Sequence, residues 1–301
     1  MTENTRLVSI VGFRRSGTTW LYRFFREHDG VFVPFIKEMN YFAQRAGTLH
    51  PYQLDRIQQH FHDIKATLEA RGLGLTPHAL ERRDRAEMRS DADYLRFYQS
   101  RAGDLPFFDI SPSYCEIGRE GLCAMADLCP EARVVLLIRD RADHLWSEVN
   151  LLQRRLHPDL TADEIFRQLR ARIEAGDPTA PPPAQYRRTH EDLTAVFSAS
   201  RVLTLFTEDL FDPARQQGVL SRLCDFIGVP RRPLGAFEYS ANRGRYDPMP
   251  EEVRDFAVRH GQADYLWALE TFGRLPQRWH DNHAAAVGTP VEGDQALSEG
   301  K

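Results

Sequence analysis

Short apolar runs recur along the chain and are separated by longer amphipathic stretches. We predict β-strands at residues 7–11, 31–33, 107–110, 133–138 and 201–206. Most of these runs are apolar at successive positions rather than alternate ones, which is typical of strands buried on both faces of a parallel sheet. The clearest is the run at 133–138, RVVLLI.

The intervening stretches carry apolar residues at helical spacing. We predict helices at residues 18–28, 51–71, 90–101, 119–128, 142–155, 161–175 and 214–228, and a helical C-terminal region over 251–272. In the first of these, Leu21, Phe24 and Phe25 share one face. The proline-rich segment at 177–184 is expected to be a surface loop. Strands that alternate with helices predict an α/β fold, with three layers (α/β/α) around a central parallel sheet.

Length and composition suit one domain with a sizeable core. The chain has 301 residues, of which 42% are hydrophobic, and we expect a single domain over 1–283 followed by a disordered polar tail at 284–301. A net charge of −4 argues against nucleic acid as a partner but allows a local basic pocket. No apolar stretch approaches the roughly 20 residues of a membrane span. Because a signal-peptide pattern is also missing, we expect a cytoplasmic protein. The four cysteines have no CxxC spacing, and no metal site is expected.

A glycine-rich turn joins the first predicted strand to the first helix. Its sequence from Gly12 to Thr19, GFRRSGTT, has the glycine spacing of a P-loop. Such a turn points backbone N–H groups and a helix N-terminus at an anion. Thr18 stands where a nucleoside triphosphatase needs lysine, and the positive charge lies instead at Arg14 and Arg15. The fold is therefore expected to be P-loop-like, with a loop suited to a phosphate group but not to ATP with magnesium.

A second anion site is predicted after the strand at 133–138. Arg139 lies where this strand ends, and Ser147 follows eight residues later, about two turns into the next helix. A guanidinium fork and a hydroxyl can hold one phosphate. Alone, the two residues would be read as a surface ion pair and a helix hydroxyl. Together with the glycine-rich turn, they favour a ligand with two phosphate groups.

The unit GFRRSGTTWL at 12–21, the KExxYF segment at 37–42 and the Arg139–Ser147 spacing together resemble the sulfotransferase family that uses 3′-phosphoadenosine 5′-phosphosulfate (PAPS). The resemblance is to the carboxylate-using branch, which includes heparan-sulfate-type and bacterial enzymes. It implies that the first loop binds the 5′-phosphosulfate, that Trp20 stacks on adenine, and that Arg139 and Ser147 bind the 3′-phosphate. The implied loop residues are Arg14, Arg15, Ser16, Gly17, Thr18 and Thr19. Arg243 and Arg245 would reach the 3′-phosphate from a closing loop. A core aromatic on an amphipathic helix is the alternative for Trp20.

The resemblance also implies the catalytic residues. Glu38 would be the general base, and Lys37 and Arg15 would stabilise the sulfuryl oxygens and the leaving phosphate. The segment FFDISPSY at 107–114 lacks the histidine that the cytosolic branch uses as its base. PAPS would be the donor, 3′-phosphoadenosine 5′-phosphate (PAP) the product, and no metal would be required. The acceptor is expected to be a hydroxyl of a small molecule or glycan. The stretch at 51–104, which the resemblance does not cover, is expected to shape its pocket.

Two other functions remain open on the sequence. One is a P-loop small-molecule kinase or phosphotransferase, against which the threonine at position 18 and the second arginine–serine pair argue. The other is a non-catalytic nucleotide-binding protein, which would keep both loops without transferring a group. Neither the oligomeric state nor the identity of the acceptor can be inferred from these motifs.

Overall fold

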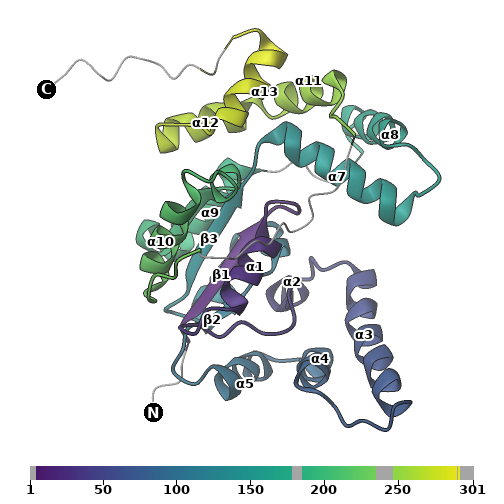
Figure 1. Cartoon of the computed structure of the whole chain (residues 1–301), viewed down its shortest axis with the longest axis vertical. Coiled ribbons are helices and arrows are strands. Elements are labelled where there is room, and N and C mark those ends of the chain that lie inside the picture. Colours follow the sequence, from purple (N-terminus) through teal and green to yellow (C-terminus); the bar gives the residue numbers. More distant parts are fainter. Residues whose placement is uncertain (1–4, 178–184, 235–246, 290, 292–301) are drawn as a thin grey trace, which may run out of the picture.

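A four-stranded parallel sheet forms the centre of the computed structural model, which describes residues 5–177, 185–234, 247–289 and 291 (Figure 1). Its strands are β1 (Leu7–Gly12), β2 (Phe107–Asp109), β3 (Arg133–Ile138) and β4 (Val202–Phe206), in the order β2-β1-β3-β4. All three pairings are parallel. The predicted three-layer α/β fold is thus confirmed, and the two strands that precede the predicted anion sites are neighbours.

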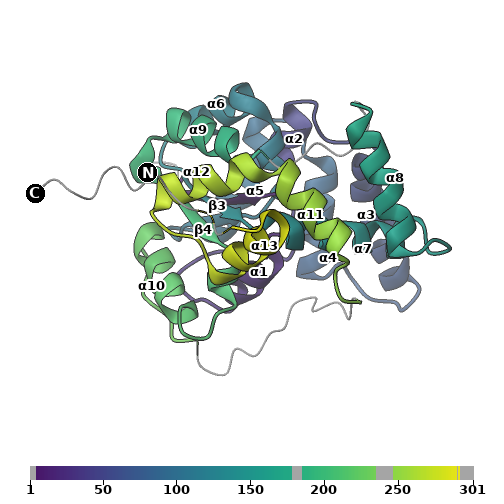
Figure 2. The ribbon, with the colours of Figure 1, turned by 90° about the horizontal axis from the view of Figure 1, so that it is seen from above.

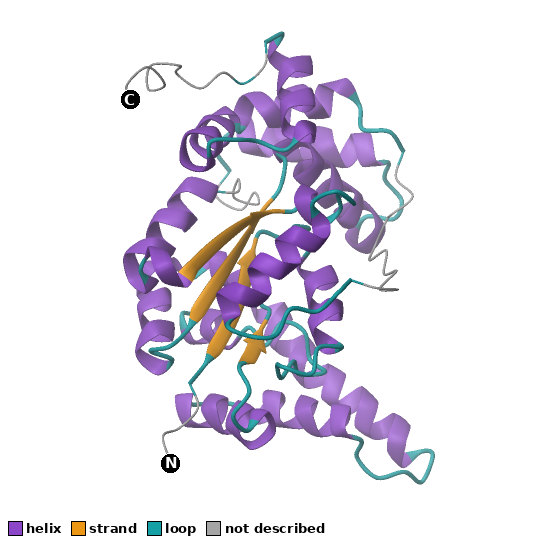
Figure 3. Cartoon of the chain, turned by 60° about the vertical axis from the view of Figure 1, so that its left-hand side comes forward, coloured by secondary structure: helices purple, strands orange, loops and turns teal. Residues whose placement is uncertain are grey.

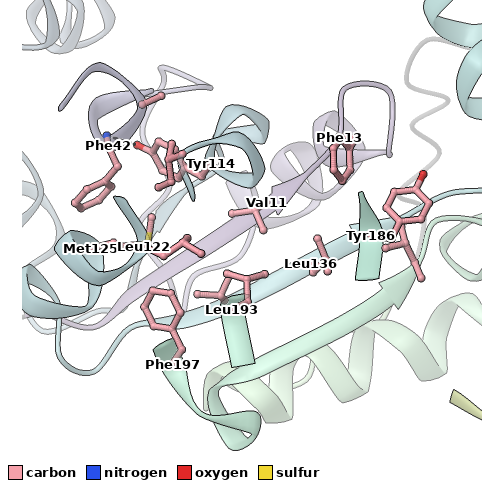
Figure 4. Packing of buried hydrophobic residues seen from close by; sticks show 14 of the residues in the cluster. Val11, Phe13, Phe42, Tyr114, Leu122, Met125, Leu136, Tyr186, Leu193 and Phe197 are labelled. Carbon is pink, nitrogen blue, oxygen red and sulfur yellow. Dashed lines mark hydrogen bonds between the residues drawn. The ribbon is translucent and has the colours of Figure 1, made fainter. Parts of the chain in front are cut away.

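Successive residues of each strand serve two different cores, one on each face of the sheet. On one face, Val11 and Leu136 pack against residues of α6 and α9, among them Met125 and Leu193 (Figure 4). On the other face, the intervening strand residues pack against α1 and α10. Figure 2 shows α6 and α9 on one side of the sheet and α1 and α10 on the other. The apolar runs were continuous because both faces of the sheet are covered.

Helices make up most of the remaining described chain, on both sides of the strands (Figure 3). Their bounds are α1 Thr18–Arg26, α2 Tyr41–Arg45, α3 Pro51–Glu69, α4 Pro77–Glu87, α5 Asp91–Ala102, α6 Gly118–Leu128, α7 Arg141–Leu156, α8 Ala162–Glu174, α9 Tyr186–Phe197, α10 Gln216–Ile227, α11 Glu251–His260, α12 Gln262–Phe272 and α13 Gln277–Val287. Short 3₁₀ turns lie at Pro112–Glu116 (η1), Ala199–Arg201 (η2) and Glu208–Leu210 (η3). No helix in the described ranges is both long and apolar enough to span a membrane.

The structure differs from the predicted elements in a few places. The strand predicted at 31–33 is reduced to a single bridge between Phe32 and Phe107, because Pro34 follows and has no N–H to continue the ladder. Four helices were not predicted: α2, α4, α9 and α13. The α4 sequence is dominated by charged residues and gives a weak apolar pattern. Helix α13 continues to Val287, past residue 284 where the tail was expected to begin.

The C-terminal helices are held to the sheet by two buried acidic side chains. Asp140, directly after β3, accepts hydrogen bonds from Tyr265 of α12 and Asn282 of α13, each at 2.7 Å. Glu208 of η3 accepts the Asp140 backbone N–H at 2.9 Å and Trp279 Nε1 of α13 at 2.9 Å. Burial, and then the nearby Asp140 carboxylate, raise the pKa of Glu208 from 4.5 to about 7. Ionisation of this side chain therefore costs stability in the folded chain.

We expect Glu208→Gln to change how stability depends on pH. Because the folded-state pKa lies above the unfolded value, the parent loses stability as pH rises from about 4.5 to about 7. Urea unfolding at pH 5 and pH 7.5 should show the variant gaining about 2 kcal/mol relative to the parent over that interval. Glu270→Gln, on the exposed side of α12, is the control and should follow the parent. If the stability of Glu208→Gln changed with pH as the parent's does, the raised pKa of Glu208 would be contradicted.

Candidate active site

One large cavity opens at the carboxyl ends of the strands. It has a volume of about 1890 Å³. Most of the residues predicted from the sequence line it, namely Arg14, Arg15, Gly17, Thr18, Thr19, Trp20, Lys37, Glu38, Arg139 and Ser147. Ser16 is buried beneath the loop and does not line the cavity. Arg243 and Arg245 lie outside the described residues.

The glycine-rich turn is packed too tightly for side chains at its two glycines. A Cβ at Gly12 would come within 2.8 Å of the backbone oxygen of Leu137 in β3. Gly17, with φ of 86°, precedes the first residue of α1, and a Cβ there would lie 3.3 Å from Thr207. Thr207 also donates its hydroxyl to the Ser16 backbone oxygen at 2.9 Å. The turn is therefore fixed by β3 and the end of β4, with the N-terminus of α1 behind it.

The two predicted anion sites meet. Arg15 Nε donates to Ser147 Oγ at 2.9 Å, across 132 residues of sequence. One guanidinium nitrogen of Arg139 donates to the backbone oxygen of Arg15 at 2.7 Å. Arg15 itself has a left-handed backbone with φ of 71°, a conformation that is costly for a residue with a side chain. The arginine–serine pair and the glycine-rich turn thus form one continuous basic surface.

The sequence did not reveal the surroundings of Ser16, in the glycine-rich turn, or of Trp20, in α1. The Ser16 hydroxyl is buried and has no hydrogen-bond partner among the described residues, so the loop holds a polar group that an anion or water could satisfy. Trp20 borders the cavity but is buried, and its ring stacks on Phe24 with centroids 5.8 Å apart. It also meets Phe211 edge-on at 5.9 Å. Trp20 is therefore part of the core of α1 as well as of the cavity wall.

Lys37 and Glu38 lie on the same cavity, on the side of β2. Lys37 Nζ contacts Glu38 Oε1 at 2.7 Å, and the Glu38 side chain is 44% exposed. Glu38 has a left-handed backbone with φ of 68°, and its N–H donates to the Ile110 oxygen at 3.1 Å. A strained residue held at a cavity is typical of a functional site. The exposed carboxylate is accessible to a ligand, with an ammonium group beside it.

A buried hydrogen-bond network supports this segment from below. The Asp109 carboxylate, at the end of β2, accepts hydrogen bonds from Ser111 at 2.6 Å, Tyr114 at 2.7 Å and Tyr94 at 3.0 Å. Ser111 Oγ in turn accepts the N–H of Asn40 at 2.9 Å. Burial raises the pKa of Asp109, while these three donors lower it. Ser111 therefore contacts the loop that carries Glu38, Asp109 holds Ser111 in place, and neither residue lines the cavity.

Helix α4 fixes the same segment on both sides of the Lys37–Glu38 pair. Glu81 Oε2 accepts the N–H groups of Phe35 at 2.6 Å and Ile36 at 3.3 Å. One turn later, Arg85 Nε donates to the Met39 backbone oxygen. Both side chains are buried. The sequence did not point to either residue, because α4 was not predicted and their partners lie more than forty positions away.

Together, the parallel sheet, the glycine-rich turn and the paired anion sites define a P-loop-like α/β protein with room for a ligand bearing two phosphate groups. A comparison with protein families matches residues 8–233 to the sulfotransferase family. The match covers more than half of the chain, and the chain therefore belongs to the sulfotransferase family.

Solved structures with the same fold include several sulfotransferases. A sulfotransferase from Alicyclobacillus acidocaldarius is similar with a TM-score of 0.61 and 18% identity, over 90% of this chain and 97% of that one. The sulfotransferase domain from the curacin biosynthetic pathway has a TM-score of 0.46 and 19% identity, over 95% and 98%. Mouse sulfotransferase SULT7A1, complexed with PAP, has a TM-score of 0.46 and 9% identity, over 86% and 87%. No curated protein matched the sequence.

Removal of the Glu81 carboxylate should destabilise the chain. In Glu81→Ala, two buried N–H groups lose their acceptor, and we expect urea unfolding to show a loss of about 2 kcal/mol or more. Glu81→Gln keeps an acceptor oxygen and should lose clearly less. Glu87→Ala, on the exposed end of the same helix, controls for helix propensity. If Glu81→Ala were as stable as Glu87→Ala, the role of α4 in holding this segment would be refuted.

Proposed function

We propose that this chain transfers a sulfuryl group from PAPS to an acceptor hydroxyl. The observation that supports this most directly is the contact between the two anion sites, in which Arg15 Nε reaches Ser147 Oγ at 2.9 Å. A donor with a phosphosulfate at one end of an adenosine and a phosphate on its ribose needs two such sites in one cavity. A ligand with a single phosphate chain would need only the glycine-rich turn.

The donor supplies an activated sulfuryl group, and the residues of the chain bind it. We assign the 5′-phosphosulfate to the backbone N–H groups of the turn, to Arg15 and to the hydroxyls of Thr18 and Thr19. We assign the 3′-phosphate to Arg139 and Ser147. Arg15, Thr18 and Thr19 all line the cavity, which supports an anion bound at this turn. Trp20, despite its stacking on Phe24, borders the cavity where adenine would lie.

Glu38 is assigned as the general base. The acceptor oxygen forms a bond to sulfur while the bond between sulfur and the bridging oxygen of the 5′-phosphate breaks, and that electron pair leaves with PAP. The acceptor proton passes to the Glu38 carboxylate. Once Glu38 is protonated, its charge no longer neutralises Lys37, whose Nζ lies 2.7 Å away. The ammonium group then becomes available to the negative charge that grows on the leaving phosphate.

PAP should stabilise the chain more than other nucleotides do. At saturating concentration we expect PAP to raise Tm by about 5 °C, and adenosine 5′-phosphate or ATP with magnesium to raise it less, because they lack the 3′-phosphate. In Ser147→Ala, the increase in Tm caused by PAP should exceed that caused by adenosine 5′-phosphate by less than in the parent. Stabilisation by ATP with magnesium equal to that by PAP would instead favour a kinase.

Glu38→Gln should abolish turnover and leave PAP binding within a few-fold of the parent. The amide keeps the size of the side chain but cannot take the acceptor proton. Turnover is measured with labelled PAPS, and PAP affinity by calorimetry. Glu120→Gln, an exposed change on α6, is the control and should keep full activity. Unchanged turnover in Glu38→Gln would rule out its role as base.

A further inference from the structure

The cavity extends well beyond the residues assigned to the donor. Past the Lys37–Glu38 pair it is walled on one side by the first turns of α3 and on the other by the second half of α7. Figure 1 shows these two helices on the same side of the sheet. The opposite end of the cavity lies by the ends of β3 and β4, where Arg139 and Thr207 are found. The space between α3 and α7 is therefore available to the acceptor.

The α7 wall of this space carries three leucines beside Glu148 and Arg155. Leu151, Leu152 and Leu156 line it, at positions that share one face of the helix. Leu156 is 62% exposed, so its side chain is accessible to a ligand. Leu156 lies nine residues beyond Ser147, which corresponds to about 13 Å of helix. The leucines themselves span residues 151–156, about 7.5 Å of helix, which can cover an extended run of about six carbon atoms.

The α3 wall adds an aromatic ring and a cation. Tyr52 is 57% exposed, and the Arg56 guanidinium lies 5.7 Å from the centre of its ring. Arg56 contacts His60 at 3.4 Å and has no acidic partner among the described residues. No residue of α3 is fully buried. This helix therefore presents its first turns to the cavity while contributing little to the core.

The charged groups at this end are mainly positive. Arg155, on the same face of α7 as the leucines, has no hydrogen bond or ion pair within the described chain and lines the cavity. The acidic residue of that wall is Glu148, whose Oε2 is buried and without a described hydrogen-bond partner. Burial raises the pKa of Glu148, while the charges of Arg14, Arg15 and Arg155 lower it. Neither Arg56 nor Arg155 forms an ion pair with a carboxylate in the described part of the chain, and both line the cavity, so both can attract an anion.

These features favour one class of acceptor over another. A glycan would place many hydroxyl groups against leucines, and each hydroxyl without a partner would cost free energy. An apolar chain would instead cover the exposed leucines and the Tyr52 ring. An acidic group at the end of such a chain would meet the two arginines.

We propose that the acceptor is a hydroxylated amphiphile, with an apolar segment of at least about six carbons and an anionic group remote from the reacting hydroxyl. This inference rests on the proposed function for the reacting end, but the binding of such a molecule can be measured without any transfer. The apolar segment would lie along Leu151, Leu152 and Leu156, and the anion would contact Arg56 and Arg155.

The test uses ω-hydroxy acids as probes. Binding of 4-hydroxybutyrate, 10-hydroxydecanoate and methyl 10-hydroxydecanoate to the full chain is measured by calorimetry, with and without PAP. We expect 10-hydroxydecanoate to bind about tenfold more tightly than its methyl ester, because only the acid can pair with the two arginines. The difference is modest because an exposed ion pair contributes less free energy than a buried one. The four-carbon acid should bind more weakly still, because it leaves most of the apolar wall uncovered.

Variants test which residues make the difference. Arg56→Leu combined with Arg155→Leu should remove the preference for the acid over the ester. Arg155→Leu alone should weaken the preference, whereas Arg154→Leu, a neighbour on α7 that does not line the cavity and that also loses one positive charge, should keep it. Leu152→Gln should reduce the advantage of the ten-carbon acid over the four-carbon acid. The PAP-loaded measurements exclude binding of the acid at the donor's anion sites.

The outcomes separate this inference from the proposed function. If the acid and the ester bind equally, if neither binds, or if the double variant keeps the preference, the acceptor class is wrong whatever the chain does with PAPS. If PAP does not bind but the acid preference and its loss in the double variant are observed, the acceptor class stands and the assignment of the donor fails. Transfer from PAPS to 10-hydroxydecanoate in preference to the ester would support both.

Discussion

The contact between the glycine-rich turn and the segment from Arg139 to Ser147 is the interaction on which the site depends. Arg15 reaches Ser147, and Arg139 holds the Arg15 backbone. This is possible because β1 and β3 are neighbours and parallel, so that both connections leave the sheet at the same edge. Parallel strand order thus brings together residues that lie 124 and 132 positions apart in the chain.

Several charged or strained groups at this edge are stable only because the rest of the fold supports them. Arg15 and Glu38 have left-handed backbones, and each is held by hydrogen bonds from neighbouring elements. Helix α4 uses Glu81 and Arg85 to fix the backbone around Glu38. The buried acidic pair Asp140 and Glu208 holds the C-terminal helices to the same edge. The same contacts therefore stabilise the fold and hold the residues of the site in position.

The sequence located residues of the cavity wall where the signal is local spacing. The turn at Gly12 to Thr19 and the Lys37–Glu38 pair could be recognised because each lies within a few residues of a strand end. The role of α4 could not be recognised. Glu81 and Arg85 stand in a sequence rich in arginine and acid, which reads as a solvated surface, and their partners are more than forty residues away.

The sequence by itself determined the strands, the main helices and the residues that face the cavity, because apolar periodicity and glycine spacing are local properties of a chain. Only the tertiary structure decided which of these residues meet. Strand order joined the two predicted anion sites, Pro34 reduced a predicted strand to one bridge, and α3 and α7 brought three leucines and two arginines to the wall of one cavity. These outcomes depend on contacts between distant segments, which no local pattern encodes.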